Sequence, residues 1–341
     1  HHRDLHSFPT RRSSDLREAI EVSNNVIAVK IAERIGVDKC FQYLKKLGIT
    51  TLQEGGDVND NNLSAIALGG MSQGLTPLEI TNAFGTIANG GVRNQNLTFT
   101  KITDKNGNII LENKSKKTFV VDEKVAYLVH DMMYTGAVRG LAKNAAIRPG
   151  NAGIPIAGKT GTTSSKIDAW FVGYTPYYVA GMWIGNDMQV PLDEGSSSAA
   201  RYWRDIMKEL HVDLPNKSFK KPEEIGLISM NVDNKSGKIP TSLTARDPQN
   251  TIIKEWFIPG TQPTEKDDIH VEIEICTDSG KLTTPYCPES SIKSVVKRLR
   301  LDESYTPYAF LKPNERPFAI KDSVYTIPRS YLNSSGVDFA K

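Results

Sequence analysis

The first part of the chain shows a helical spacing of apolar residues. The apolar residues Ile27, Ile31 and Ile35 are four positions apart, with Val26 beside the first of them and Ile20 seven positions before it. This spacing predicts helices across residues 17–47, because positions three and four apart share one face of a helix. Gly36 and Gly48 are expected to end helices, and Asn24 and Asn25 to cap the helix that begins near Val26.

The middle of the chain carries both helix and strand signals. Helices are predicted at residues 77–89, 123–134 and 198–210, and strands at 169–174 and 178–184. Residues 99–111 alternate around Asn106-Gly107, which predicts a hairpin with a type I′ turn. Helices followed by strands and a closing helix indicate an α+β fold, with an antiparallel sheet flanked by helices.

The two ends of the chain differ from this middle part. Residues 1–16 show neither period and resemble translated adapter sequence, so they are expected to be a non-native leader, with a loose native arm as the alternative. Residues 212–341 hold many Lys, Pro, Ser and Thr with short apolar runs, and are expected to be a poorly packed, partly disordered extension. Within it, Ser236–Thr241 and Ser279–Thr284 echo one another.

Composition excludes several classes of protein. The 42 basic and 39 acidic residues nearly balance at a net charge of +3, which gives no support to nucleic-acid binding. No apolar run reaches the roughly 18–20 residues that span a bilayer, so any membrane anchor is expected upstream of this sequence. Cys276 and Cys287 bracket a short loop and form either a disulfide or a free pair; zinc is not expected there, because two thiolates fill half of a tetrahedral site.

The chemistry of the chain centres on Gly158-Lys159-Thr160-Gly161-Thr162-Thr163. K-T-G is the third element of penicillin-recognising serine enzymes, whose second is an S-D-N type triplet, here Ser23-Asn24-Asn25. Lys159 fits a base or electrostatic partner, and Ser23 a proton relay. Asn25 would hold a substrate amide, Thr160, Thr162 and Thr163 a substrate carboxylate, and Gly161 would let a substrate backbone approach the strand.

Taken alone, a K-T-G tripeptide is more often a strand end and an S-x-N triplet a helix cap, so the assignment depends on the sequence around the two motifs. That surrounding sequence includes Ala67-Leu68-Gly69, Gly74–Ile80, Ala88-Asn89-Gly90-Gly91 and Asp168-Ala169-Trp170-Phe171. Together with K-T-G they strongly resemble the transpeptidase domain of class A penicillin-binding proteins, over residues 17–211. The extension at 212–341 more loosely resembles tails of such proteins from Gram-positive anaerobes.

This resemblance implies the penicillin-binding and serine β-lactamase-like transpeptidase fold, truncated at its N-terminus. It implies a cell-membrane protein whose domain faces the extracytoplasmic side. The activity implied is serine D,D-transpeptidation of peptidoglycan stem peptides at D-alanyl-D-alanine, inhibited covalently by β-lactams, without metal or cofactor. Carried over by motif, Ser23, Asn25 and Lys159 are catalytic, and Thr160, Gly161, Thr162 and Thr163 bind substrate.

The nucleophile of the pattern is missing. It belongs in S-x-x-K on a helix ahead of the triplet, whereas Ser218–Lys221 and Ser290–Lys293 have this spacing but follow K-T-G. The chain alone is therefore expected to be inactive. Two alternatives stay open: a non-catalytic domain that binds stem peptides or cell-wall polymer, and a relative of D,D-carboxypeptidases or β-lactamases that hydrolyses its substrate.

Overall fold

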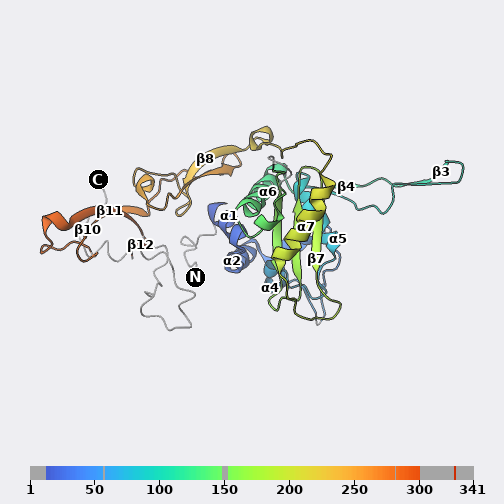
Figure 1. The fold of residues 1–341 in the computed structure, drawn as a ribbon, viewed down its shortest axis with the longest axis horizontal. Helices are drawn as coiled ribbons and strands as arrows, with labels where there is room; N and C mark the ends of the chain where they lie inside the picture. Colours follow the sequence, from blue (N-terminus) through green and yellow to red (C-terminus); the bar gives the residue numbers. More distant parts are fainter. Residues whose placement is uncertain (1–12, 57, 148–152, 281, 300–325, 328–341) are drawn as a thin grey trace. The chain divides into compact units, whose positions relative to one another are not determined.

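The structure is a computed structural model, which describes residues 13–56, 58–147, 153–280, 282–299 and 326–327. The chain divides into two compact units (Figure 1). One comprises Leu16–Ile228 with Trp256–Gly260, and the other His1–Asp15, Ser229–Glu255 and Thr261–Lys341. The expected leader at 1–16 lies outside the described residues as far as residue 12, and its last residues open a helix.

Seven α-helices are described, in the order α1 (Ser13–Val22), α2 (Asn25–Ile35), α3 (Val37–Leu47), α4 (Leu63–Leu68), α5 (Pro77–Ala88), α6 (Glu123–Val138) and α7 (Ser196–Leu210). The helices expected within 17–47 are confirmed, and Gly36 and Gly48 end α2 and α3 at positive φ. Asn24 caps α2 by accepting hydrogen bonds from Val26 N at 3.0 Å and Ile27 N at 3.3 Å. Asn25 is the first residue of that helix.

The larger unit is built around a three-stranded antiparallel sheet. Its strands are β5 (Ala157–Thr162), β6 (Ala169–Tyr174) and β7 (Val179–Ile184), in the order β5-β6-β7. Side chains of α5 and α6 pack on the face that carries Ala157 and Tyr174. Figure 1 shows α7 running along the strands, and it buries Trp203 against Phe171 on the other face. The expected α+β fold, with helices on an antiparallel sheet, is confirmed.

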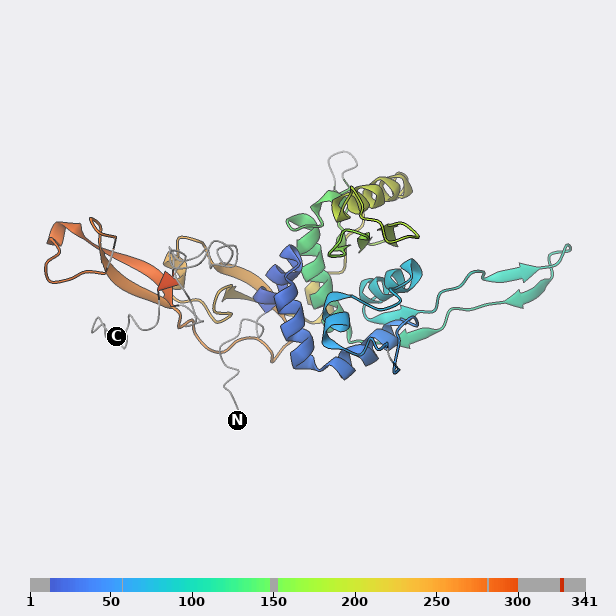
Figure 2. The ribbon, with the colours of Figure 1, turned by 90° about the horizontal axis from the view of Figure 1, so that it is seen from below.

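The predicted hairpin exists, but its turn differs from the prediction. Figure 2 shows it at the end of a long two-stranded arm, formed by β1 (Val92–Asn94), β2 (Lys101–Thr103), β3 (Ile109–Glu112) and β4 (Lys117–Phe119). A type I′ turn needs positive φ at both central residues, and only Gly107 of the pair Asn106-Gly107 has it, at +86°. The type I′ assignment is therefore wrong.

The side chain of Asp104 explains this turn. Its carboxylate accepts hydrogen bonds from the backbone N–H groups of Asn106 and Asn108, each at 2.8 Å. Such a local bond between a side chain and the backbone stabilises a longer turn than the two-residue type. The pairing register also shifts between Ile102 and Thr103, as expected when an extra residue enters one strand.

Replacing Gly91 with alanine is expected to lower the free energy of unfolding of the larger unit by about 3 kcal/mol. Gly91 has φ +86°, which strains an alanine by about 1–2 kcal/mol, and a Cβ there would lie 2.0 Å from the Val121 carbonyl oxygen. Gly74→Ala is the matched control, because Gly74 has φ +68° and no atom within 4 Å of such a Cβ. Urea unfolding followed by tryptophan fluorescence measures both, and equal losses would disprove the clash.

The described part of the smaller unit contains two separate small sheets, one of two strands and one of three. β8 (Ile228–Asp233) pairs with β9 (Ile252–Phe257), and β10 (His270–Cys276) pairs with β11 (Ile292–Leu299), which also pairs with β12 (Thr326–Ile327). The short apolar runs of the extension build these strands, so the described part of residues 212–341 is packed, and the expectation of a poorly packed extension is wrong there. One buried cluster consists of Ile269, Val271, Ile273, Leu299 and Ile327.

The sequence echo in the extension is a structural repeat. Gly237 and Gly280 both have φ +67°, and each donates its N–H, at 2.7 Å, to the carbonyl of the residue that ends the preceding strand, Asp233 or Cys276. Cys276 and Cys287 are free thiols in this structure, so of the two states left open the bridged one is not observed. Hydrogen bonds to Ser279 and Cys287 lower the pKa of Cys276.

Candidate active site

Ser23 lies at the junction of α1 and α2, in an unusual backbone conformation. Its φ is +54°, in the left-handed region that a non-glycine residue adopts at a cost of about 1 kcal/mol. The junction holds because Asn24 caps α2 on one side and donates its N–H to the Ala19 carbonyl of α1 at 2.8 Å. The side chain of Ser23 is exposed.

Two polar contacts fix α1 against α6 and thereby set the position of this junction. Arg17 is buried and pairs with the Asp131 carboxylate at 2.5 Å, with a second hydrogen bond to Thr135 Oγ1 at 2.6 Å. Glu21, one turn after Arg17 in α1, pairs with Arg139 just beyond the end of α6 at 3.0 Å. The sequence analysis missed this signal, in which Arg17 and Glu21 lie four residues apart on one face of α1.

Lys159 on β5 reaches this junction. Its Nζ donates a hydrogen bond to Ser23 Oγ at 2.8 Å and another to the Thr160 carbonyl at 2.8 Å. The two residues are 136 positions apart in the chain. Burial lowers the pKa of Lys159, because a charged ammonium loses its hydration there. A lysine so placed exchanges a proton with the serine hydroxyl more readily than an exposed one.

The other predicted site residues occupy different positions along β5. Thr160 is buried and pairs with Phe171, so alternation places it on the opposite face of the sheet from Lys159. Gly161 pairs with Trp170, and a Cβ on Gly161 would lie 3.3 Å from Trp170 Cβ. This glycine makes room for the tryptophan across the strand. Thr162 ends β5 and is exposed.

Thr163 takes part in the turn that follows β5. Its Oγ1 accepts hydrogen bonds from the backbone N–H groups of Ile167 and Asp168, each at 2.9 Å. Asp168 in turn accepts a hydrogen bond from the Trp183 indole at 2.9 Å. The hydroxyl oxygen of Thr163 therefore orders the turn between β5 and β6. Asn25, exposed at the start of α2, lies two residues from Ser23.

The edge of β5 is available for pairing within the sheet β5-β6-β7. β5 is the outer strand of this sheet, so one side of its backbone makes no ladder bonds to β6. An extended peptide can add to such an edge through backbone hydrogen bonds. Lys159, which contacts Ser23, belongs to this edge strand. A peptide paired with β5 would therefore lie close to the Lys159–Ser23 pair.

Sequences with the S-x-x-K spacing lie elsewhere and have different backbones. Ser218–Lys221 precedes the 3₁₀ helix Pro222–Ile225, and Ser290 lies in the 3₁₀ helix Glu289–Ser291 with Lys293 on β11. A third match that the sequence analysis overlooked, Ser294–Lys297, lies on β11. None of these three pairs lies in an α-helix, where residues three apart share a face.

Comparison with known proteins identifies the family. A family model described as the penicillin binding protein transpeptidase domain matches residues 3–208. The chain belongs to this family. A second model, the penicillin-binding protein 1A C-terminal domain, matches residues 225–272.

Among curated relatives, penicillin-binding protein 1A of Clostridium botulinum strain Langeland is 38% identical over 325 residues, which cover 94% of this chain and 38% of that protein. Penicillin-binding protein 1A of Clostridium novyi strain NT is 34% identical over 94% of this chain and 35% of that protein. The chain thus spans little more than a third of these penicillin-binding relatives.

Solved penicillin-binding proteins share the fold. Penicillin-binding protein 1A from Haemophilus influenzae matches with a TM-score of 0.58 at 22% identity, over 74% of this chain and 41% of that one. The PonA1 protein from Mycobacterium tuberculosis in complex with penicillin V matches with a TM-score of 0.54 at 21% identity, over 61% of this chain and 59% of that one. Among the described residues, no helix is both long and apolar enough to cross a membrane.

Proposed function

We propose that this chain supplies the second and third motifs of a serine D,D-transpeptidase, which cross-links peptidoglycan stem peptides at D-alanyl-D-alanine. One observation carries the proposal: the 2.8 Å hydrogen bond from Lys159 Nζ to Ser23 Oγ joins the two motifs in space. The family assignment and the outer position of β5 support it. A β-lactam is proposed as the covalent inhibitor, because it presents an acyl group and a carboxylate to the same residues.

Each predicted residue has a role in this proposal. Ser23 relays a proton, and Lys159, with its pKa lowered by burial, is the partner that gives or takes it. Asn25 holds a substrate amide, and Thr162, exposed at the end of β5, binds the substrate carboxylate. The Thr160 side chain is buried on the other face, so Thr160 contributes its carbonyl, which accepts a hydrogen bond from Lys159 Nζ. Thr163 orders the turn behind them through its bonds to Ile167 and Asp168. Gly161 has no side chain, which lets a substrate backbone approach β5 at that position.

The nucleophilic serine is proposed to come from a helical S-x-x-K that this 341-residue sequence does not contain ahead of Ser23. We therefore expect no covalent adduct when the purified chain is incubated with excess benzylpenicillin and its intact mass is measured. Ser218, Ser290 and Ser294 are not expected to be acylated, because none of them shares one face of an α-helix with the lysine three positions later. A stoichiometric adduct that maps to Ser218, Ser290 or Ser294 would contradict the proposal.

A peptide-binding measurement separates the enzyme fragment from a non-catalytic binding domain. Titration with an acylated D-alanyl-D-alanine peptide, followed by NMR, is expected to show millimolar or weaker binding, because part of the proposed site is not in the chain. Lys159→Ala should abolish that binding, whereas Lys143→Ala, which removes an exposed lysine of the same unit, should leave it unchanged. Micromolar binding by the chain would favour the non-catalytic domain. Release of free D-alanine would favour the hydrolytic alternative.

The limits of the domains and the cellular location of the protein are further proposals. We infer a transpeptidase domain at 17–211 and an extension at 212–341, and the two matched family models, at 3–208 and 225–272, support the boundary between them. The first model begins at residue 3, so it gives no support to a non-native leader at 1–16. We also infer that the domain faces the extracytoplasmic side of a cell membrane. Its anchor would belong to sequence upstream of this chain.

A further inference from the structure

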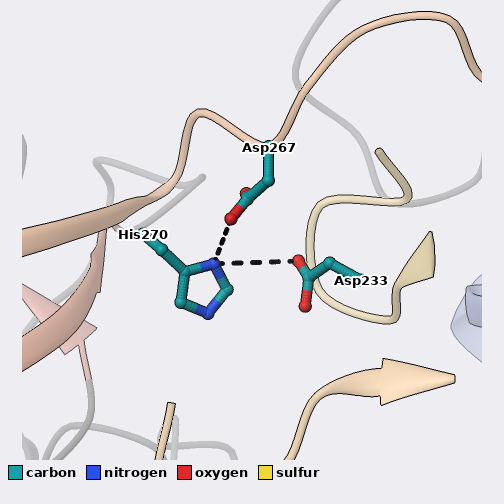
Figure 3. A group of neighbouring side chains, drawn as sticks. All are labelled: Asp233, Asp267 and His270. Atoms are coloured by element: carbon teal, nitrogen blue, oxygen red, sulfur yellow. Dashed lines mark hydrogen bonds and ion pairs between the residues drawn. The ribbon is translucent and has the colours of Figure 1, made fainter. Parts of the chain in front are cut away.

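A buried cluster of acidic residues surrounds a histidine in the smaller unit. Figure 3 shows Asp233, Asp267 and His270, whose ligand atoms all lie within 4.8 Å of one another. Asp233 ends β8, His270 begins β10, and Asp267 lies three residues before His270. All three side chains have an exposed fraction of 0%. The sequence analysis named no metal site, because these residues are spread over 38 positions without a familiar spacing.

The charges of this cluster do not balance by themselves. Asp233, Asp247 and Asp267 bring three buried carboxylates, and Arg298 compensates one of them through its Nε, 3.0 Å from Asp247 Oδ2. The carboxylates of Asp233 and Asp267 then bring two further negative charges, and buried charges that are not compensated are strongly unfavourable. A protonated His270 would supply one positive charge, whereas a divalent cation would supply both.

Both ring nitrogens of His270 are hydrogen-bonded to carboxylates, Nε2 to Asp247 and Nδ1 to Asp267. Its Nε2 lies 2.9 Å from Asp247 Oδ2, an arrangement in which histidine donates its N–H to a carboxylate. Metal-bound histidines usually donate their second nitrogen in this way, which directs the lone pair of the other nitrogen at the ion. Here that other nitrogen is Nδ1, which is hydrogen-bonded to Asp267 Oδ2 at 2.5 Å and lies 4.0 Å from Asp233 Oδ2, so a bound ion would replace the Nδ1 proton.

One carboxylate oxygen in the cluster has no partner. Asp233 Oδ1 is buried without a hydrogen bond, while Asp233 Oδ2 accepts one from Ser236 N at 2.5 Å. Figure 3 shows the Asp233 carboxylate facing the imidazole ring. A buried carboxylate oxygen without a partner is costly, and coordination of a cation removes that cost. Asp267 is held in place by Thr244 Oγ1 at 2.5 Å and by Ile269 N at 3.2 Å.

We propose that Asp233, Asp267 and His270 Nδ1 bind one divalent transition-metal ion, with Asp247 as the carboxylate that orients His270. Mixed imidazole and carboxylate ligands suit Zn²⁺ and Mn²⁺ better than Mg²⁺ or Ca²⁺, which prefer oxygen alone. Ligand atoms on a tetrahedral Zn²⁺ lie about 3.3 Å apart, given bonds of about 2.0–2.1 Å. The separations of Nδ1 from Asp267 Oδ2 and Asp233 Oδ2, 2.5 and 4.0 Å, bracket that value, and all three ligand atoms lie within 4.8 Å of one another.

The test is metal binding by the full chain after treatment with EDTA and dialysis. Equilibrium dialysis with ZnCl₂ and then MnCl₂, read by elemental analysis, is expected to give one ion per chain at this site. Because His1, His2 and His6 also offer imidazoles, the chain used carries alanine at these three positions. No bound ion at 100-fold excess of either metal over protein would overturn the proposal.

Variants assign the ion to the cluster. Asp233→Asn and His270→Ala should each abolish binding, and Asp247→Asn should weaken it about 10- to 100-fold while the stoichiometry is kept. Asp268→Asn is the matched control, because Asp268 lies next to Asp267 but is exposed and pairs with Lys238. Binding that survives in the Asp233 and His270 variants, or that is lost equally in the Asp268 variant, would overturn the assignment. The stoichiometry of the parent chain stands even if a variant fails to fold.

Discussion

Replacing Trp203 with alanine is expected to lower the free energy of unfolding of the larger unit by about 4 kcal/mol. Trp203 is 1% exposed and meets the Phe171 ring edge to face, with ring centroids 5.0 Å apart. Its indole N–H also donates to the Ala180 carbonyl at 2.9 Å. The substitution therefore leaves a large cavity between α7 and the sheet and removes the partner of a β7 carbonyl.

Tyr202→Ala is the matched control for this change. Tyr202 is the preceding residue of α7 and is 45% exposed, so its loss should change the free energy of unfolding by no more than about 0.5 kcal/mol. Urea unfolding followed by tryptophan fluorescence is the measurement. All four tryptophans lie in the larger unit, and three remain in the Trp203 variant. A loss below about 2 kcal/mol for Trp203→Ala would contradict the core described here.

Acid is expected to destabilise the same unit before its carboxylates titrate. Burial lowers the pKa of His130 to about 4, from 6.5, because the imidazolium has no compensating charge among the surrounding rings. The unfolded chain thus binds a proton that the folded chain does not, so stability is complete above pH 6.5 and falls as the pH drops towards 4. Between pH 7.5 and 5 the free energy of unfolding should fall by about 2 kcal/mol.

The His130→Asn variant tests this pH dependence. The asparagine side chain does not titrate and places an amide near the position of Nδ1, which lies 3.0 Å from the Tyr174 hydroxyl. The fall between pH 7.5 and 5 should disappear in the variant, whatever its stability at pH 7.5. Persistence of the full fall would show that another group is responsible.

Glu79 sets the lower limit of the pH range for that experiment. Burial raises the pKa of Glu79, but hydrogen bonds from the backbone and hydroxyl groups of Thr50 and Thr76 outweigh it and lower the pKa to about 2, from 4.5. This contribution to stability is complete above pH 4.5 and is lost as the pH falls towards 2. Measurements at pH 5 and above therefore separate the effect of His130 from that of Glu79.

Local patterns predicted the elements of the larger unit well. Gly36, Gly48 and Pro77 mark helix limits through their own backbone restrictions, so the limits of α2, α3 and α5 follow from neighbouring residues. The turn at Asn106-Gly107 was predicted wrongly for a related reason. Asp104 competes for the backbone N–H groups through a side-chain bond, and a dipeptide rule does not include that third residue.

The sequence predicted which residues form the candidate site, but it did not predict which of them contact one another. The K-T-G and Ser23-Asn24-Asn25 motifs were recognisable because they are short and contiguous. The roles expected for Thr160 and Thr163 depend on which face of β5 each occupies and on the following turn. Strand alternation gives the first, whereas the hydrogen bonds that Thr163 Oγ1 accepts from Ile167 and Asp168 depend on the conformation of the turn after β5.

By itself, the sequence determined the helical and strand periods, the motifs and the family, because each is encoded by residues close together in the chain. Only the tertiary structure decided which distant residues meet. The bond between Lys159 and Ser23 depends on α1 packing against α6, and the cluster around His270 depends on three separate segments folding together. Burial then decides their chemistry, since the loss of water lowers the pKa of Lys159 and makes the carboxylates around His270 depend on a compensating positive charge.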